Sequence, residues 1–404
     1  MTSRSERKQQ RALARHGKVR PQSKPRAFFA FLAKTVAVVA ISALTVTGVS
    51  AWELSQSIQG RSIQLIGADG KAFTTPTVED LKGPINILLV GSDTRAGQGK
   101  GYGNDTSELA DVIILLHISE DRKNAAALSF PRDLLVPYPR CPSTTGGPGY
   151  LPQSLGQINA TIANGGPGCT LLTVQELTGV NIPYLAMIDF KGVIEMSNAI
   201  GGVEVCVAEE IADEYTNTYL KPGTHVLQGK KALQFLRTRH GVGDGSDLAR
   251  ISNQQVFLTS LIRKVKSQGV LTNPVYLYSL ANAAARNMKL SESMTDINVM
   301  VSLASALQDV ELDKITFLQV PARGGLPAPY SGRVAPIYEQ ANVLFSKIAK
   351  DEPLVLAKAN TGAGAIVKDD PSASPSPSPS GSPDKDTLPD WARGTNAATT
   401  TCSS

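Results

Sequence analysis

An apolar stretch near the amino terminus, AFFAFLAKTVAVVAISALTVTGVSAW at residues 27–52, constrains the architecture more than any other feature. About 20 apolar residues cross a bilayer as a helix, and this stretch carries a single charge, Lys34. Nine of the 40 Lys and Arg residues precede it in residues 1–26, which orients the amino terminus toward the cytoplasm. A cleaved signal peptide is the alternative, but no convincing small-residue cleavage site follows. We expect an uncleaved single transmembrane helix.

The net charge of +5 comes from this basic tail, because the residues after it hold slightly more acidic than basic side chains. The main body therefore lacks the basic footprint of a nucleic-acid-binding protein, and we expect no nucleic-acid partner. Anionic membrane lipids are the expected partner of the tail.

The four cysteines all follow the apolar stretch, so we expect them outside the cytoplasm, where disulfides form. They are Cys141, Cys169, Cys206 and Cys402. They show neither the CxxC spacing nor the Cys/His pairing of zinc sites. Of the three possible connectivities we favour Cys141–Cys169, because these two cysteines bracket a Pro/Gly-rich loop.

Strand-like and helix-like segments alternate along residues 84–350. INILLVG, DVIILLHIS and NAAALSF are nearly continuously apolar, as in strands covered on both faces, whereas ALQFL and LARISNQQVFLTSLIRKVKS have helical spacing. We expect an α/β fold class, a single large extracytoplasmic domain with a central mixed β-sheet flanked by helices, preceded by one transmembrane helix. Residues 53–83 are interpreted as a connector. Residues 351–404, which include PSASPSPSPSGSPDKD, are predicted to be a disordered tail.

Polar residues occur at the ends of the three predicted strands. Asp93 and Arg95 follow the first strand, Asp111 begins the second, and Arg132 leaves the third through the rigid SFPRD turn. Functional side chains gather at the carboxyl ends of strands in α/β sheets. Asp93 and Asp111 could hold one Mg²⁺ through carboxylate oxygens. From spacing alone, a capped turn at Asp93 and a solvated strand end at Asp111 are the favoured interpretation.

The segment RTRHGVGDGSDLARISNQQ, residues 237–255, gathers three arginines around a glycine-rich bend. Its glycines favour a helix that ends before Arg237. In the extended backbone that we then expect, Arg237 and Arg239 share one face. Asp247 is a plausible N-cap for the helix that begins with the next residue.

In that next helix, Arg250 and Gln254 fall on the apolar side, one turn apart. The polar side of the same helix includes Asn253 and Ser260. A charge on an apolar face is costly without a partner, which indicates a site whose arginines bind phosphate. The alternative is that Arg250 is neutralised by Asp247 and Gln254 by backbone.

Several segments together resemble the LytR-CpsA-Psr family of bacterial cell-envelope transferases, in an actinobacterial-like form. They are NILLVGSDTR, ELADVIILLHI, the strand ending in SFPRD, QINATIANGGP, IGGVEV and ALQFLRTRHGVGDGSDLARISNQQ. The resemblance covers about residues 84–266. It implies transfer of a glycopolymer from a polyprenyl-pyrophosphate carrier to peptidoglycan, with formation of a phosphodiester bond.

The resemblance also implies roles for individual residues. Asp93 and Asp111 correspond to aspartates associated with Mg²⁺ or Mn²⁺, Arg132 is implied as catalytic with them, and Asp247 would position the arginines. The implied pyrophosphate-binding residues are Arg95, Arg132, Arg237, Arg239, Arg250 and Gln254. Because a prenyl chain gains about 0.8 kcal/mol per buried CH₂ group, we expect an apolar tunnel between sheet and helices.

Two other functions use the same site. A membrane-anchored binding or regulatory protein would hold the lipid-linked polymer without transferring it, and a polyprenyl-pyrophosphate hydrolase would use water as the acceptor. The sequence does not identify the glycopolymer.

Overall fold

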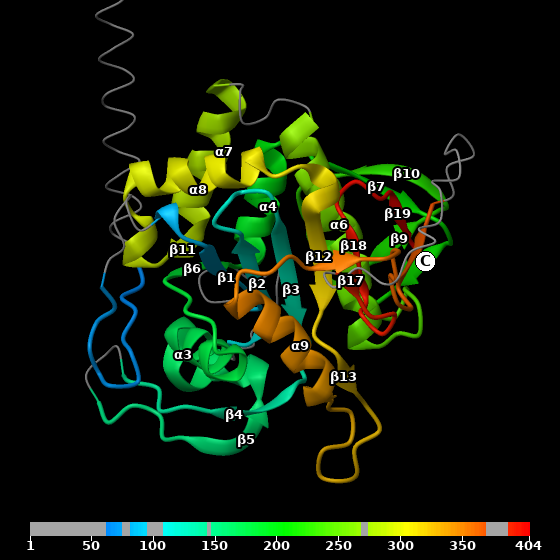
Figure 1. The fold of residues 1–404 in the computed structure, drawn as a ribbon. Coiled ribbons are helices and arrows are strands. Elements are labelled where there is room, and N and C mark those ends of the chain that lie inside the picture. Colours follow the sequence, from blue (N-terminus) through cyan, green and yellow to red (C-terminus); the bar gives the residue numbers. More distant parts are fainter. Residues whose placement is uncertain (1–61, 75–80, 95–107, 144–146, 268–273, 369–386) are drawn as a thin grey trace, which may run out of the picture. The chain divides into compact units, whose positions relative to one another are not determined.

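A computed structural model describes residues 62–74, 81–94, 108–143, 147–267, 274–368 and 387–404 (Figure 1). The predicted anchor at residues 27–52 lies outside these ranges. Among the described residues, no helix combines the length and apolarity needed to cross a membrane.

A seven-stranded mixed sheet forms the centre of the domain. In spatial order its strands are β11 (Met288–Leu290), β6 (Tyr184–Ile188), β1 (Ile85–Ser92), β2 (Ala110–Ile118), β3 (Ala125–Phe130), β12 (Ile315–Gln319) and β18 (Gly394–Asn396). The pairs β1–β6 and β3–β12 are parallel, and the other neighbours are antiparallel. The apolar runs that predicted strands are β1, β2 and β3, and every residue of β3 is buried. The prediction of a central mixed sheet flanked by helices is confirmed.

Helices cover both faces of this sheet (Figure 1). Leu171 of α3 and Phe345 of α9 pack with the strands on one face, while Val299 and Leu303 of α8 pack on the other. The helices are α3 (Thr161–Thr178), α4 (Phe190–Ala199), α5 (Lys230–Arg237), α6 (Asp247–Ser267), α7 (Pro274–Asn287), α8 (Ile297–Asp309) and α9 (Tyr338–Ala349). Both faces are therefore buried, which explains why the strands lack polar alternation.

A smaller four-stranded sheet packs against α5 and α6. Its order is β10 (Gly223–Leu227), β7 (Val203–Val207), β19 (Thr401–Ser403) and β16 (Ala365–Val367). Four two-stranded pairs complete the described strands: β4 (Leu135–Tyr138) with β5 (Gln153–Gln157), β8 (Ile211–Asp213) with β9 (Thr218–Leu220), β13 (Ala322–Arg323) with β14 (Ala335–Pro336), and β15 (Val355–Leu356) with β17 (Thr387–Leu388).

The prediction of a disordered tail over residues 351–404 is wrong, because the described part of this segment contains paired β-strands. β18 pairs with β12 at the edge of the central sheet, and β19 inserts between β7 and β16 in the smaller sheet (Figure 1). These strands are too short to show a hydrophobic period, and their pairing partners lie far away in the sequence. Sequence pattern therefore could not distinguish them from the Pro/Ser tract, whose residues 369–386 lie outside the described ranges.

Two disulfides link all four cysteines. The predicted Cys141–Cys169 bond is present, and the second bond joins Cys206 of β7 to Cys402 of β19. The second pair is separated by 196 residues and the first by 28. In the chain-entropy model, the longer loop gives the larger stabilisation.

We expect the double substitution Cys206→Ala and Cys402→Ala to lower the free energy of unfolding by about 2–5 kcal/mol, because it frees the end of the chain in the unfolded state. Thermal and denaturant unfolding under non-reducing conditions measure this. The pair Cys141→Ala and Cys169→Ala is the matched control with the shorter loop and should cost less. Reactive thiols at Cys206 and Cys402 in the unreduced protein would contradict the pairing.

Candidate functional site

The predicted strand-end residues lie at one edge of the central sheet, the edge formed by the carboxyl ends of β1 and β3. β1 and β3 run in the same direction, so Asp93, just after β1, and Arg132, just after β3, leave the same edge. β2 runs in the opposite direction and starts there, which brings Asp111 to that edge as well.

A β-bulge sets the place of Asp111. Gly91 pairs with Val112 and Ser92 pairs with Ala110, so Asp111 is the extra residue on β2. A bulge bends its strand and redirects the side chain of the extra residue. The Asp111 carboxylate is largely buried, with 16% of its side-chain surface exposed. It is therefore not the solvated strand end that its sequence context permitted.

Arg132 lies among three carboxylates. Its Nη1 donates to Asp111 Oδ1 at 2.6 Å, and its Nε lies 3.5 Å from Asp247 Oδ1 and 3.6 Å from Asp133 Oδ2. Burial alone would lower the pKa of Arg132, but the carboxylates of Asp111, Asp247 and Asp133 together raise it. The guanidinium therefore stays charged, and the carboxylates fix its orientation.

Arg250 joins the same network from the first turn of α6. Its Nη2 lies 2.5 Å from Asp247 Oδ1 and donates to the backbone oxygen of Asp111 at 3.2 Å. Arg250 is buried, with 5% of its surface exposed. We name the five side chains of Asp111, Arg132, Asp133, Asp247 and Arg250 the arginine–aspartate network.

Asp247 is a buried carboxylate of this network, with 10% of its side-chain surface exposed. Burial raises its pKa, against the opposing effects of Arg250 and Arg132. Its Oδ1 lies close to both arginines, yet neither carboxylate oxygen accepts a hydrogen bond of regular geometry from the described residues. The predicted N-cap at Asp247 is wrong, because α6 begins at Asp247 and the hydroxyl of Ser246 accepts from the N–H of Ala249. Ser246 occupies the capping position, which leaves the Asp247 carboxylate to the arginines.

The pair Arg237 and Arg239 is held by different contacts. Arg237 ends α5, so the prediction that the helix stops before it is wrong, and its guanidinium lies 4.3 Å from the centre of the Phe190 ring. Arg239 follows the extended residue Thr238, and its Nη2 lies 3.3 Å from His240 Nε2. A cation over an aromatic face is held electrostatically and by packing.

Asp213, at the end of β8, organises the arginine segment and was not predicted. Its Oδ2 accepts from the Thr238 hydroxyl at 2.7 Å and from the N–H groups of Arg239 and His240 at 3.0 and 3.2 Å. Its Oδ1 accepts from two further N–H groups in its own turn. Asp213 lies outside any motif and 26 residues from Arg239, so no local pattern indicates the contact.

Two more partners of the network were also missed. Asp133 Oδ1 accepts from Gln157 Nε2 at 2.7 Å and from Arg333 Nη1 at 3.2 Å. Arg333 follows Asp133 by 200 residues, a separation across which sequence spacing carries no information. Gln157 is the first residue of the QINATIANGGP segment. The membership of this segment in the family resemblance was the only feature of the sequence that could have indicated Gln157 as a site residue.

Two further predicted residues have structural partners, and a third lies outside the description. Gln254 Nε2 donates to the backbone oxygen of Leu236 at 3.0 Å, and Asp93 Oδ1 accepts from the N–H of Leu109 at 2.7 Å. Gln254 thus bonds to backbone and Arg250 pairs with Asp247, as the alternative interpretation of this helix expected. Asp93 is bonded to Leu109, 16 residues away and just before β2, and not to a residue of a local turn, while Arg95 lies outside the described residues.

The predicted metal pair fits a hard cation in its chemistry. Asp93 and Asp111 supply carboxylate oxygens from neighbouring strands at the same sheet edge, and Mg²⁺ needs one or two carboxylates besides substrate phosphates. Within the described ranges, no group of three or more His, Cys, Asp or Glu side chains gathers as a cage for a metal ion. The donor set suits a cation that is completed by the substrate, so Mg²⁺ or Mn²⁺ binding stays a prediction.

Polar residues on the predicted polar side of α6 are buried in the structure. Asn253 and Ser260 are 0% and 7% exposed. Asn253 donates to the backbone oxygen of Phe235 and accepts from the Ser403 hydroxyl of β19. The carboxy-terminal strands cover this side of the helix and satisfy its polar groups.

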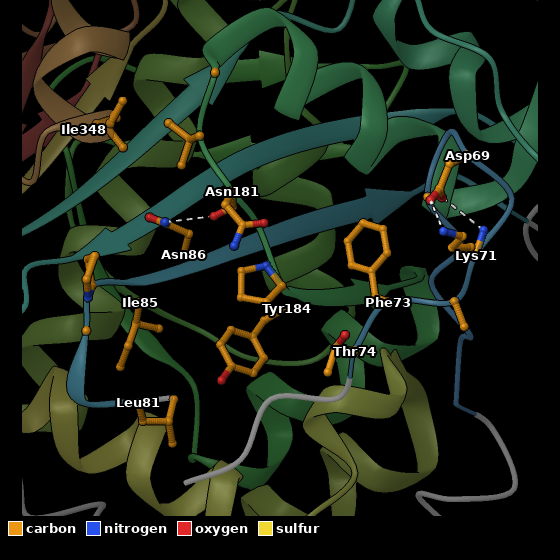
Figure 2. Close-up of a pocket in the computed structure, with 18 residues that line it drawn as sticks. Asp69, Lys71, Phe73, Thr74, Leu81, Ile85, Asn86, Asn181, Tyr184 and Ile348 are labelled. Carbon is orange, nitrogen blue, oxygen red and sulfur yellow. Dashed lines mark hydrogen bonds and ion pairs between the residues drawn. The ribbon is translucent and has the colours of Figure 1, made fainter. Parts of the chain in front are cut away.

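A cavity of about 950 Å³ lies away from these residues, at the amino-terminal end of β1. Ile85, Asn86 and Tyr184 line it, together with residues 67–74 (Figure 2). This is the opposite sheet edge from Asp93, so we do not assign the network's chemistry to it. Where we expected an apolar tunnel, the described side chains of α8 form a packed core with the sheet, and the tunnel stays a prediction.

Comparisons with known proteins agree with the sequence resemblance. Residues 54–342 match the model of the LytR_cpsA_psr family. The chain is 27% identical over 313 residues to the cell wall biosynthesis protein LcpA of Corynebacterium glutamicum, covering 71% of this chain and 59% of that protein. It is 28% identical over 241 residues to TagT of Bacillus subtilis, a polyisoprenyl-teichoic acid–peptidoglycan teichoic acid transferase, covering 58% of this chain and 68% of TagT. The chain thus spans less than two thirds of LcpA.

The fold also matches a solved structure. A LytR-Csp2A-Psr enzyme from Actinomyces oris superimposes with a TM-score of 0.52 at 23% identity, covering 71% of this chain and 95% of that one. At this identity the match supports the fold alone.

We expect Asp247→Ala to lower the free energy of unfolding by about 3–5 kcal/mol, because it leaves Arg250 buried without its nearest carboxylate. Denaturant unfolding measures the change. Asp313→Ala is the matched control, since Asp313 pairs with Lys314 on the surface and should cost no more than about 1 kcal/mol. Equal effects of the two substitutions would contradict the buried pairing.

Asp213 generates a pH-dependent prediction. Burial would raise its pKa, but the hydrogen bonds from Thr238 and from the N–H groups of Arg239, Thr216 and Tyr215 lower it below its ordinary 3.8. A lowered carboxyl pKa gives stability that is present above the ordinary value and is lost as the pH falls through the folded-state value.

Asp213→Asn should therefore cost about 1.5–3 kcal/mol near pH 7, and the difference from the unsubstituted protein should shrink below about pH 4. Denaturant unfolding across this pH range measures it. Glu214→Gln, at the exposed neighbouring position, is the control. A cost for Asp213→Asn that does not change with pH would show that its ionisation plays no part.

Proposed function

The chain belongs to the LytR_cpsA_psr family, and from this we propose that it transfers a glycopolymer from a polyprenyl-pyrophosphate carrier to peptidoglycan in cell wall assembly. The name of TagT as a teichoic acid transferase to peptidoglycan supports the proposal. So does the name of LcpA as a cell wall biosynthesis protein. That the transferred group is a glycopolymer, and that the reaction is a transfer to peptidoglycan, are both proposed here for this chain.

The arginine–aspartate network is the observation that carries it. Arg132 and Arg250 are oriented by carboxylates at the edge where β1 and β3 end and β2 begins. A guanidinium offers paired donors that match phosphate oxygens. Phosphoryl transfer depends mainly on positioning and on stabilising charge, which preoriented arginines provide.

In the proposed reaction, a peptidoglycan hydroxyl oxygen forms a bond to the glycan-side phosphorus of the pyrophosphate. The bond from that phosphorus to the bridging oxygen breaks, and polyprenyl phosphate leaves with the electron pair. The hydroxyl proton passes to a carboxylate at this sheet edge. Arg132 and Arg250 would stabilise the negative charge on the phosphoryl oxygens, and Arg237, Arg239 and Gln254 would extend the contacts with the pyrophosphate.

Asp93 and Asp111 would hold Mg²⁺ or Mn²⁺, which when bound neutralises phosphate charge. Asp111 would bind the cation and would also accept the hydrogen bond from Arg132. Asp93 has its Oδ1 engaged by the N–H of Leu109, which fixes the carboxylate at the sheet edge. Asp247 would position both arginines without touching the substrate.

The proposed location is the outer face of the cytoplasmic membrane, with the amino terminus in the cytoplasm and residues 27–52 as the anchor. Two disulfides support an oxidising compartment for the domain. A lipid-linked donor and a peptidoglycan acceptor would both be present there.

We expect Arg132→Ala to reduce transfer by about a hundredfold or more, because it removes a donor aimed at developing phosphate charge. The assay uses the full chain, Mg²⁺, a synthetic polyprenyl-pyrophosphate glycan and peptidoglycan oligomers, with detection of a phosphodiester-linked product. Arg323→Ala, on the exposed strand β13, is the matched control and should retain activity. Asp93→Ala should be as inactive as Arg132→Ala.

Other products would assign a different function. Release of glycan phosphate without a linked product would favour a hydrolase. Tight binding of the lipid-linked glycan with no turnover, and with Asp93→Ala unchanged, would favour a binding or regulatory protein.

A further inference from the structure

A cavity of about 380 Å³ lies at the same sheet edge as the arginine–aspartate network. Gln319, the last residue of β12, lines it and pairs with Ser129 of β3, just before the exit to Arg132. Leu248 lines it from α6 and directly follows Asp247. The cavity therefore adjoins the network through two neighbouring elements, β12 and α6.

Its wall combines one aromatic ring with several amides. Trp391 lines the cavity with Gln319, Gln340 and Asn360, and Asp390 and Arg393 add one charge of each sign. Amide groups can donate and accept at once, and a carboxylate accepts from hydroxyl groups. The indole offers a flat, electron-rich face to C–H groups. The volume lies within the range of about 300–1,000 Å³ that is usual for small-ligand sites.

Gln319 brings a side-chain amide to the cavity wall. The residue is buried, with 5% of its surface exposed, and its backbone N–H donates to the Arg393 oxygen, which fixes it at the end of β12. A side-chain amide can donate and accept hydrogen bonds at once, so this wall fits a hydroxyl-rich ligand.

The wall chemistry suits a saccharide better than the other ligands of the proposed reaction. A pyrophosphate group requires a surplus of positive charge, but here Asp390 offsets Arg393. A prenyl chain would fit the apolar part of the wall, which includes Leu248 and Ile337, but it would leave the amide and carboxylate groups without partners.

We infer that this cavity is a saccharide subsite, in which a sugar ring stacks on Trp391 and its hydroxyl groups bind Gln319 and Gln340. The inference rests on the proposed function, since the sugar belongs either to the peptidoglycan acceptor or to the transferred glycopolymer. The segment after residue 350 supplies Asn360, Asp390, Trp391 and Arg393, all beyond the matched family region at residues 54–342. The stacking residue Trp391 thus lies outside that region, whereas Gln319 and Gln340 lie within it.

Tryptophan fluorescence of the full chain tests the subsite. Because the chain has two tryptophans, Trp52→Phe leaves Trp391 as the single emitter. The probes are a soluble peptidoglycan glycan oligomer without peptides and, separately, the glycopolymer released from its lipid. Binding should shift the emission of Trp391. Gln340→Ala should weaken binding by about fivefold to tenfold, the loss of one or two hydrogen bonds. Gln308→Ala, exposed on α8, is the matched control and should bind as the parent does.

Each outcome decides one point. A shift with the peptidoglycan oligomer assigns the subsite to the acceptor, and a shift with the glycopolymer alone assigns it to the donor. No shift with either probe at millimolar concentration, together with normal transfer by Gln340→Ala, overturns the inference and leaves the proposed function standing. A shift that Gln340→Ala weakens, in a protein without transferase activity, supports the subsite while the proposed function fails.

Discussion

The pairing of one buried and one half-buried guanidinium group with three carboxylates is the constraint on which the site depends. Arg132 and Arg250 come from the exit of β3 and the first turn of α6, and Asp111 comes from the bulge in β2. Buried charges require partners, so these three elements must keep their relative positions for each charge to stay paired. The same ion pairs hold the arginines in place at the sheet edge where the proposed phosphate chemistry would occur.

Periodicity and strand-end position predicted the central strands and the edge at which Asp93, Asp111 and Arg132 meet. They did not predict the partners, because pairing across the sheet depends on topology. Arg333 and Asp213 reach the site segments from distant positions and carry no motif. The exact helix ends were also missed at Arg237 and Asp247, since Ser246 and Asp247 are both good capping residues and only the backbone geometry distinguishes them.

The polar residues of α6 show why amphipathic patterns can mislead. Asn253 was assigned to the polar side of the helix, but strands from the end of the chain cover it and Ser403 donates to its side chain. A polar stripe indicates water only when no other part of the chain supplies hydrogen bonds. Here the polar groups instead specify where the last strand sits, because a buried amide accepts few alternative partners.

The late position of β18 and β19 also affects the order of assembly. β12 and β7 are synthesised well before these partners, and Cys402 follows Cys206 by 196 residues. Contacts across such a separation form slowly because the intervening loop must close first. While the chain is still emerging, one edge of each sheet is therefore open, and the cover of α6 is missing. The domain reaches its final form only after the last strand has arrived, which makes this stage the period when the chain is most exposed to mispairing and proteolysis.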